Sequence, residues 1–137
     1  MLLTINVFLP ATKDISLEVP THPVSADPGE DVILPVHLAP EISAVSMEII
    51  WSRESEPMYQ YSNGQERKFN DYENQVSLSI QELERGKLSL TLRNVQESDS
   101  GNYTCKVLHD GCQKTGTVYL QVRGKTAPAT SLLYSVK

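Results

Sequence analysis

Residues 99–105 (DSGNYTC) are the feature that most constrains how this chain can fold. Aspartate and glycine suit a tight turn, since a short polar side chain bonds to nearby backbone and glycine accepts unusual dihedral angles. After the turn, Tyr103, Cys105 and Val107 alternate with polar residues. This alternation is typical of a strand with one apolar face. The stretch therefore predicts a corner that leads into a half-buried strand.

Short runs of alternating apolar and polar residues recur along the rest of the chain, with turn signals at roughly ten-residue spacing and no helical period. Strands are predicted over residues 14–24, 32–38, 47–52, 57–62, 65–69, 76–80, 87–93, 102–108 and 117–122. Asn63-Gly64 predicts a hairpin turn, because type I′ geometry needs positive φ at both central positions. About eight or nine short strands are typical of an all-β, two-sheet antiparallel sandwich.

Length and charge exclude several classes of protein. The 137 residues are enough for one domain with its own core. The net charge is −5 and no basic block occurs, which argues against nucleic acid or anionic lipid as the main partner. No apolar run reaches the roughly 18 residues of a membrane-spanning helix, so membrane contact is expected only through a segment outside this chain.

Composition divides the chain into three segments. Residues 1–13 begin with an apolar run that lacks a basic start, and they are interpreted as a signal remnant or a disordered start. Residues 14–123 hold the strands and form the predicted domain. Residues 124–137 begin with a Pro/Ala/Thr-rich stretch and are interpreted as a linker or tail.

Three motifs make residues 15–122 resemble a V-set immunoglobulin domain, and more narrowly the butyrophilin and myelin-oligodendrocyte-glycoprotein group, which are relatives of the T-cell costimulatory ligands. They are GEDVILP (residues 29–35), LAPEISA (38–44) and MEIIW (47–51). The resemblance implies a variable-type sandwich with an extra hairpin and a tyrosine corner. It gives structural roles to Trp51, Asp99, Gly101, Tyr103 and Cys105.

The main departure from that family is Val36, which stands where the family has the first cysteine of its inter-sheet disulfide. Closing such a loop of about 70 residues is worth roughly 4 kcal/mol. Valine fills most of the missing volume, so the domain is expected to fold without the disulfide and to keep Cys105 as a buried free thiol. Cys112 is expected to lie too far from Cys105 to pair with it. It is interpreted as a free exposed thiol or as the site of an intermolecular disulfide.

A second departure is Gln75, where V-set domains commonly carry the arginine that pairs with the corner aspartate. Asp99 is therefore expected to lose its bidentate cation and to keep at best a neutral hydrogen bond.

No pattern of catalytic or metal-binding residues is found. The histidines are scattered without metal-ligand spacing, and two cysteines are too few for a structural zinc site. No nucleophile elbow, phosphate loop or glycine fingerprint occurs. The acidic pairs fall on separate turns. The chain is therefore not expected to be an enzyme, and no cofactor, metal or small-molecule substrate is expected.

Two surfaces are candidates for protein binding. Tyrosine is a favoured interface residue because it is rigid and amphipathic. The first surface is the sheet face presenting Met58, Tyr59, Tyr61 and Tyr72; the second is the loop tip His109, Asp110, Gly111 and Cys112. The alternative is that the tyrosines are core or rim residues. Asn102-Tyr103-Thr104 is a glycosylation sequon whose asparagine is expected to face outward.

The resemblance implies a butyrophilin-like recognition module at the extracellular face of the plasma membrane, or secreted. Such a module would bind a receptor on immune cells and modulate T-cell activation, T-cell receptor signalling and cytokine production. One alternative is a homophilic adhesion or structural immunoglobulin protein of the myelin type, which would self-associate. Another is a truncated paralogue with reduced function.

Overall fold

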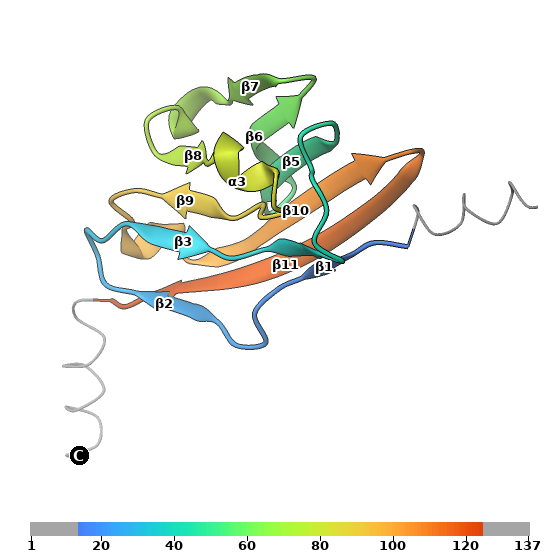
Figure 1. Ribbon diagram of the computed structural model, residues 1–137. Helices are drawn as coiled ribbons and strands as arrows, with labels where there is room; N and C mark the ends of the chain where they lie inside the picture. The colour runs from blue at the N-terminus through green and yellow to red at the C-terminus, as the bar shows by residue number, and fades with distance from the viewer. Residues whose placement is uncertain (1–13, 125–137) are drawn as a thin grey trace, which may run out of the picture.

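The computed structural model describes residues 14–124, which form two packed layers of short strands (Figure 1). The first layer is a sheet with the order β2-β11-β10-β5-β6-β7, called the front sheet below. Its strands are β2 (Val24–Ala26), β5 (Glu48–Arg53), β6 (Glu56–Ser62), β7 (Gln65–Lys68), β10 (Gly101–His109) and β11 (Cys112–Val122). Adjacent strands of this sheet run antiparallel, except that β2 pairs with β11 in parallel. The predicted sandwich is confirmed.

The second layer, called the back layer, consists of two sheets that continue one another. One has the order β3-β9-β8 and the other pairs β1 with β4. Its strands are β1 (Ser16–Glu18), β3 (Val32–Leu34), β4 (His37–Ala39), β8 (Val76–Leu78) and β9 (Leu90–Leu92). Backbone bonds from Leu88 N to Val36 O and from Leu38 N to Gly86 O, both 2.8 Å, join the two parts.

Proline explains two differences from the predicted strands. The strand expected over residues 32–38 is interrupted at Pro35, which has no N–H to donate to a ladder. The strand expected over residues 14–24 is likewise divided at Pro20 and Pro23, and its halves pair in different layers. β1 pairs with β4 in the back layer, whereas β2 pairs with β11 in the front sheet.

A short helix replaces the end of another predicted strand. β8 ends at Leu78, and α3 (Ile80–Leu83) follows with Ser79 as its N-cap. The Ser79 side chain accepts a hydrogen bond from Glu82 N at 3.4 Å. Ser79 and Glu82 have the spacing of a capping box, which is the sequence signal that could have revealed this turn. Two 3-10 turns, η1 (Asn70–Tyr72) and η2 (Glu97–Asp99), complete the elements, and within residues 14–124 no helix has the length and apolar character needed to cross a membrane.

The core lies between the two layers and is entirely apolar apart from aromatic hydroxyl, indole and thiol groups. Trp51 is fully buried, and its indole N–H donates to Leu88 O at 3.0 Å. Val36 and Cys105 are both fully buried. Valine therefore occupies the core position that the resemblance assigns to a cysteine, as expected.

The corner at residues 99–105 forms as predicted, but its electrostatics differ. The Tyr103 hydroxyl donates to the backbone oxygen of Asp99. Gln75 makes the expected neutral hydrogen bond to Asp99, at 3.1 Å between Nε2 and Oδ2. The prediction that Asp99 lacks a cation is wrong, because Arg53 Nη1 lies 3.8 Å from Asp99 Oδ1.

Arg53 reaches the corner from the end of β5 and holds it in several ways. Its guanidinium donates to the carbonyl oxygens of Ser98 and Ser100. It also lies over the Tyr103 ring, 5.6 Å from the ring centre. Arg53, on the strand next to β10, therefore supplies the positive charge beside Asp99, while Gln75 supplies a neutral donor.

Candidate functional site

The candidate binding surface is the side of the front sheet that faces away from the core, called the outer face below. Successive side chains of a strand point to opposite faces of the sheet. Residues that alternate with the buried residues of each strand therefore point outward. The register of β5, β6, β10 and β11 then aligns the outward residues across the sheet. These are Glu48, Ile50, Ser52, Gln60, Asn102, Thr104, Lys106, Leu108, Gln113, Thr115, Thr117 and Tyr119.

The outer face is polar with a few apolar side chains in it. Gln60 donates to Glu48 at 2.8 Å, and the hydroxyls of Thr104 and Thr117 lie 3.3 Å apart. Tyr119 is 44% exposed. Such a mixture of polar and apolar groups on the surface of a sheet suits contact with another protein.

Ile50 and Leu108 are half-buried, and both are neighbours of Lys106 on the outer face. Register places Lys106 opposite Ile50 on β5, and Leu108 follows Lys106 by one outward step on β10. This group of three side chains lies in the half of the outer face near the β10–β11 turn. It combines apolar contact area with one positive charge.

The turn between β10 and β11 forms one end of the sandwich, called the tip end. Asp110 and Gly111 have φ of 50° and 77°, the positive values that a two-residue type I′ turn needs. His109 Nε2 lies 3.4 Å from Asp110 Oδ2. The predicted turn at Asn63-Gly64 is confirmed by φ of 53° and 78°. It lies at the same end, because β6 runs alongside β5 toward it.

Three of the predicted contact residues are core residues instead. Met58 and Tyr59 are fully buried and Tyr61 is 3% exposed, so the prediction that they present an outward surface is wrong. Tyr59 pairs with Trp51 and Pro57 with Ser52, which leaves Met58 as the extra residue of a β-bulge. The bulge turns Met58 inward together with its neighbour.

The hydroxyls of the buried tyrosines reach polar partners at the edge of the core. Tyr59 donates to Glu66 Oε2 at 2.7 Å, and Tyr61 donates to Val45 O at 3.0 Å. Burial, with the Glu66 carboxylate as a smaller cause, raises the pKa of Tyr59. These tyrosines stabilise the hairpin and the loop at residues 40–47 from within.

Tyr72 is half-buried and lies at the other end of the sandwich, called the corner end. Its hydroxyl lies 3.4 Å from Glu56 Oε1, at the start of β6. Burial and the Glu56 charge raise the pKa of Tyr72, and nearby Arg53 partly offsets them. The two predicted surfaces are therefore not one site, since Tyr72 and residues 109–112 lie at opposite ends.

The two cysteines are free and far apart along the front sheet, as predicted. Cys105 pairs with Gly116, whereas Cys112 pairs with His109. The four residue steps between Gly116 and Cys112 correspond to roughly 13 Å along β11, well beyond disulfide reach. Burial raises the pKa of the Cys105 thiol. Cys112 is half-buried rather than exposed.

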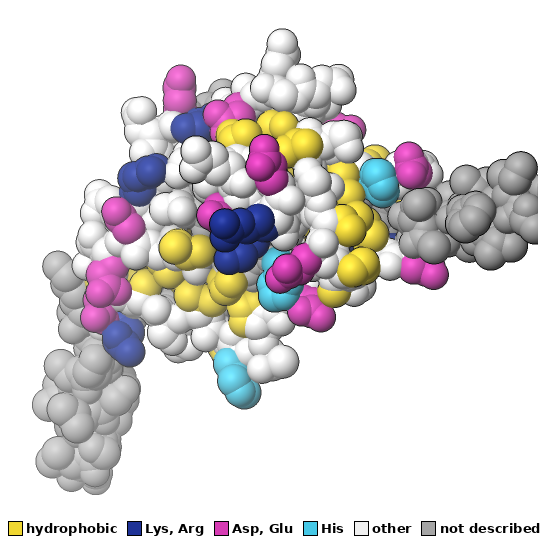
Figure 2. Space-filling view, viewed as in Figure 1, with side chains coloured by type: hydrophobic (Ala, Val, Ile, Leu, Met, Phe, Trp, Pro, Cys, Tyr) yellow, Lys and Arg dark blue, Asp and Glu magenta, His cyan; other side chains and the backbone are white. Residues whose placement is uncertain are grey.

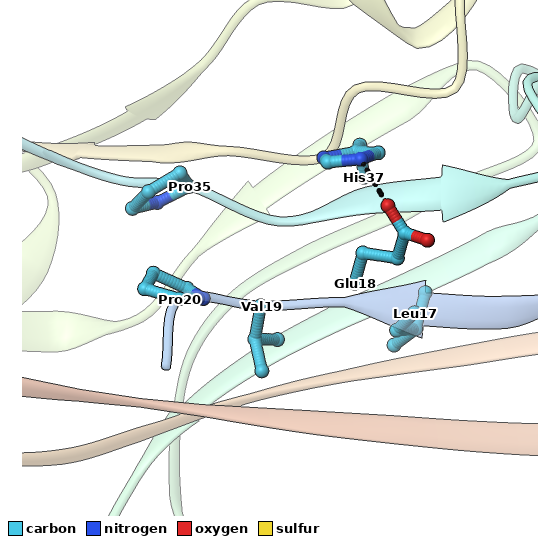
Figure 3. A pocket seen from close by; sticks show the side chains of 6 residues that line it. All are labelled: Leu17, Glu18, Val19, Pro20, Pro35 and His37. Atoms are coloured by element: carbon cyan, nitrogen blue, oxygen red, sulfur yellow. Dashed lines mark hydrogen bonds and ion pairs between the residues drawn. The ribbon is translucent and has the colours of Figure 1, made fainter. Parts of the chain in front are cut away.

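A hollow lies elsewhere, along β1 and the interruption between β3 and β4. It is an open groove of about 620 Å³ lined by Leu17, Glu18, Val19, Pro20, Pro35 and His37 (Figure 3). His37 Nε2 lies 2.7 Å from Glu18 Oε1, and both side chains are largely exposed. Among residues 14–124, no group of acidic, histidine and cysteine side chains could hold a metal ion. On the face shown in Figure 2, acidic and basic side chains are interspersed, and the basic ones do not gather into one patch.

The two-layer arrangement, the β6–β7 hairpin at the edge of the front sheet and the tyrosine corner together define a variable-type immunoglobulin domain. The chain belongs to the immunoglobulin V-set domain family, which matches residues 19–123. This membership confirms the predicted family and the prediction that the chain is not an enzyme.

Curated relatives give the same group as the sequence motifs. The chain is 32% identical to butyrophilin subfamily 1 member A1 of Bos taurus over 129 residues, which are 89% of this chain and 24% of the relative. It is 32% identical to human myelin-oligodendrocyte glycoprotein over 108 residues, which are 75% of this chain and 44% of the relative. The chain thus spans less than half the length of these relatives.

Solved structures agree. Bovine butyrophilin superposes with a TM-score of 0.74 at 31% identity, covering 80% of this chain and 54% of that one. The IgV-like domain of human B7-H4 superposes with a TM-score of 0.69 at 20% identity, covering 79% of this chain and 96% of that domain. The second likeness concerns the fold alone.

Proposed function

We propose that this chain is the recognition domain of a butyrophilin-like cell-surface protein. Residues 14–123 are the binding domain, at the extracellular face of the plasma membrane or secreted, and residues 124–137 are the linker or tail that follows it. The outer face near the tip end binds a protein receptor on immune cells, T cells among them. Binding modulates T-cell activation, T-cell receptor signalling and cytokine production.

The observation that carries this proposal is the group formed by Ile50, Lys106 and Leu108 on the outer face. The apolar members are half-buried in the sheet and held by strand pairing on both sides, so little side-chain freedom is lost on binding. The similarity to butyrophilin supports the choice of a cell-surface partner.

Binding of the oligomerised domain to T cells tests the proposal, with two matched isoleucine variants. Ile50→Asp places a charge in the proposed contact and should weaken binding about tenfold or more, the scale of an interface hot spot. Ile33 lies on β3 in the back layer and is 57% exposed. Ile33→Asp is the control and should leave binding within about twofold, since surface changes outside an interface are near neutral.

Thermal unfolding of both variants checks that they remain folded. T-cell receptor signalling and cytokine release provide a second readout of the same variants. Equal binding by Ile50→Asp and Ile33→Asp would refute the outer face as the contact. Absence of wild-type binding to any T-cell preparation would refute the partner.

The alternative function is homophilic adhesion, and the similarity to myelin-oligodendrocyte glycoprotein favours it. A self-associating domain should show a concentration-dependent mass in sedimentation equilibrium, and Ile50→Asp should abolish it. A monomer at every concentration, with T-cell binding intact, would exclude adhesion.

A further inference from the structure

We infer that Asn102 is an N-glycosylation site whose glycan rests on Tyr119 and covers the corner half of the outer face. The modification requires only that the chain enters the secretory pathway. The consequence for the binding surface rests on the proposed function.

The sequence contains one acceptor motif. Asn102-Tyr103-Thr104 satisfies the sequon, with tyrosine rather than proline in the middle. No other asparagine of the chain is followed two residues later by serine or threonine. A glycan attached through nitrogen can therefore have only this site.

The Asn102 side chain is exposed to solvent, whereas its backbone is fixed by hydrogen bonds to Glu54. Asn102 is exposed, because its neighbour Tyr103 is buried and alternation turns Asn102 the other way. Its N–H donates to Glu54 Oε2 at 3.2 Å, and its carbonyl accepts from Glu54 N at 3.3 Å. A glycan here would extend into solvent without disturbing the core.

Tyr119 lies directly across from Asn102 on β11 (Figure 1 shows the two strands). Opposed residues of neighbouring strands have Cβ atoms about 5 Å apart, so the first sugar is within reach of the ring. Tyr119 is 44% exposed and is among the large apolar side chains that the described residues leave uncovered. The electron-rich ring face attracts the C–H groups of a sugar. Sugar stacking would cover this ring.

The chemistry is a group transfer from a lipid pyrophosphate-linked oligosaccharide. The amide nitrogen of Asn102 forms a C–N bond to the anomeric carbon of the first sugar. The bond from that carbon to the pyrophosphate oxygen breaks, and the lipid pyrophosphate leaves with the electron pair. The amide gives up one proton, so the product is a neutral N-glycosyl amide and no oxidant or reductant is needed.

The position of Asn102 along β10 determines which part of the outer face the glycan leaves uncovered. Asn102 is near the start of β10, and the tip end at His109 is roughly 23 Å further along the strand at about 3.3 Å per residue. Ile50, Lys106 and Leu108 lie on the tip side of the glycan. A receptor would therefore approach the tip half, while the corner half stays shielded.

The test expresses the full chain behind a heterologous secretion leader in mammalian cells. Treatment with peptide N-glycosidase should lower the mass of the wild type and convert Asn102 to aspartate, which peptide mapping detects. Asn102→Gln and Thr104→Val should lack the glycan, whereas Thr104→Ser and the exposed control Asn74→Gln should keep it. Secreted wild-type protein with unmodified Asn102 would overturn the site, whatever the variants do.

Tyr119 and T-cell binding give separate readouts. Nitration of Tyr119 by tetranitromethane should rise severalfold when the glycan is removed, with buried Tyr59 as an unreactive reference. An unchanged rate would overturn the stacking. Wild-type protein should bind T cells equally well before and after enzymatic deglycosylation. A large gain on removal would overturn the division of the outer face, whereas no binding in either form would count against the proposed function alone.

Discussion

At the scale of single residues, the exchange of cysteine for valine at position 36 leaves the sandwich intact because Val36 is fully buried and apolar. What the chain loses is the restraint that a disulfide places on the unfolded state. Cys105, to which the family resemblance assigns the other half of that disulfide, is also fully buried in the core, and burial raises the pKa of its thiol. The two residues therefore mark where stability can be restored.

Val36→Cys should form a disulfide with Cys105 and stabilise the domain by roughly 4 kcal/mol, the value for a closed loop of about 70 residues. Urea unfolding of the same variant with and without reductant measures the gain. Thiol labelling of the denatured, unreduced variant should find only Cys112. Val36→Cys/Cys105→Ala is the control that cannot form this bond, and labelling of all three thiols in Val36→Cys would contradict the prediction.

The pair of Arg53 and Gln75 gives a second prediction at this scale. Arg53→Met removes the cation beside Asp99 and the bonds to two carbonyl groups, so it should cost about 1–3 kcal/mol. Adding Gln75→Arg should recover part of the loss by returning a cation to the family position. Urea midpoints of the single and double variants compare the two. A double variant no more stable than Arg53→Met would show that Arg53 does not substitute for that cation.

At the scale of elements, β1 and the segment after it depend on a glycine of β11. A Cβ at Gly116 would lie 2.7 Å from Val19 Cγ1 and 3.4 Å from Leu17 Cβ. Gly116→Ala should therefore displace this segment and cost about 1–3 kcal/mol. Adding Val19→Ala should recover part of the cost by making room.

Thr115→Ala is the control for the same strand, because Thr115 is exposed and points outward, and it should change stability by less than about 0.5 kcal/mol. Thermal unfolding compares the variants. If Val19→Ala does not relieve Gly116→Ala, the close approach of β1 to β11 is not the cause of the loss.

Most strands could be predicted from sequence, because the alternation of apolar and polar residues and the turn residues that bound each strand are features of short, continuous segments. The Asn63-Gly64 turn and the Tyr103 corner are examples, since the residues that form them are adjacent in the chain. The interruptions at Pro35 and near Pro20 could not be placed, because the partner strands decide whether a missing N–H is tolerated. The turn at Ser79 carries only the capping-box spacing as a sequence signal, because a helix of four residues has no periodicity.

The candidate site was harder to predict because exposure depends on register. Tyr59 and Tyr61 alternate with Gln60, so sequence alone does not tell which set faces the core. Met58 required knowledge of a bulge, which exists only in the pairing of β6 with β5. The tip turn was correctly predicted because Asp110-Gly111 is a local signal. Ile50 carries no local signal either, because its outward position follows only from the register of β5 with β10.

At the scale of the whole molecule, the core contains a thiol and phenol groups whose neutral forms are favoured by burial. Cys105 and Tyr103 are buried, and burial is the main cause that raises the pKa of each. Tyr59 behaves in the same way. In the unfolded chain the thiol titrates near about 8.5 and the phenols near about 10. The unfolded state therefore binds fewer protons than the folded state above those pH values.

The free energy of unfolding should consequently be flat near neutral pH and fall from about pH 8.5 upward, most steeply above about pH 10. Each group contributes a slope of about 1.4 kcal/mol per pH unit, because the stability follows the difference in bound protons. Urea unfolding from pH 7 to pH 11 measures this slope. Tyr59→Phe removes one phenol. Above pH 10 the unfolding free energy of this variant should therefore fall less steeply than that of the wild type, by about 1.4 kcal/mol per pH unit, even where the variant is less stable overall. Equal slopes would mean that Tyr59 ionises inside the folded domain, which its burial and its hydrogen bond to the Glu66 carboxylate argue against.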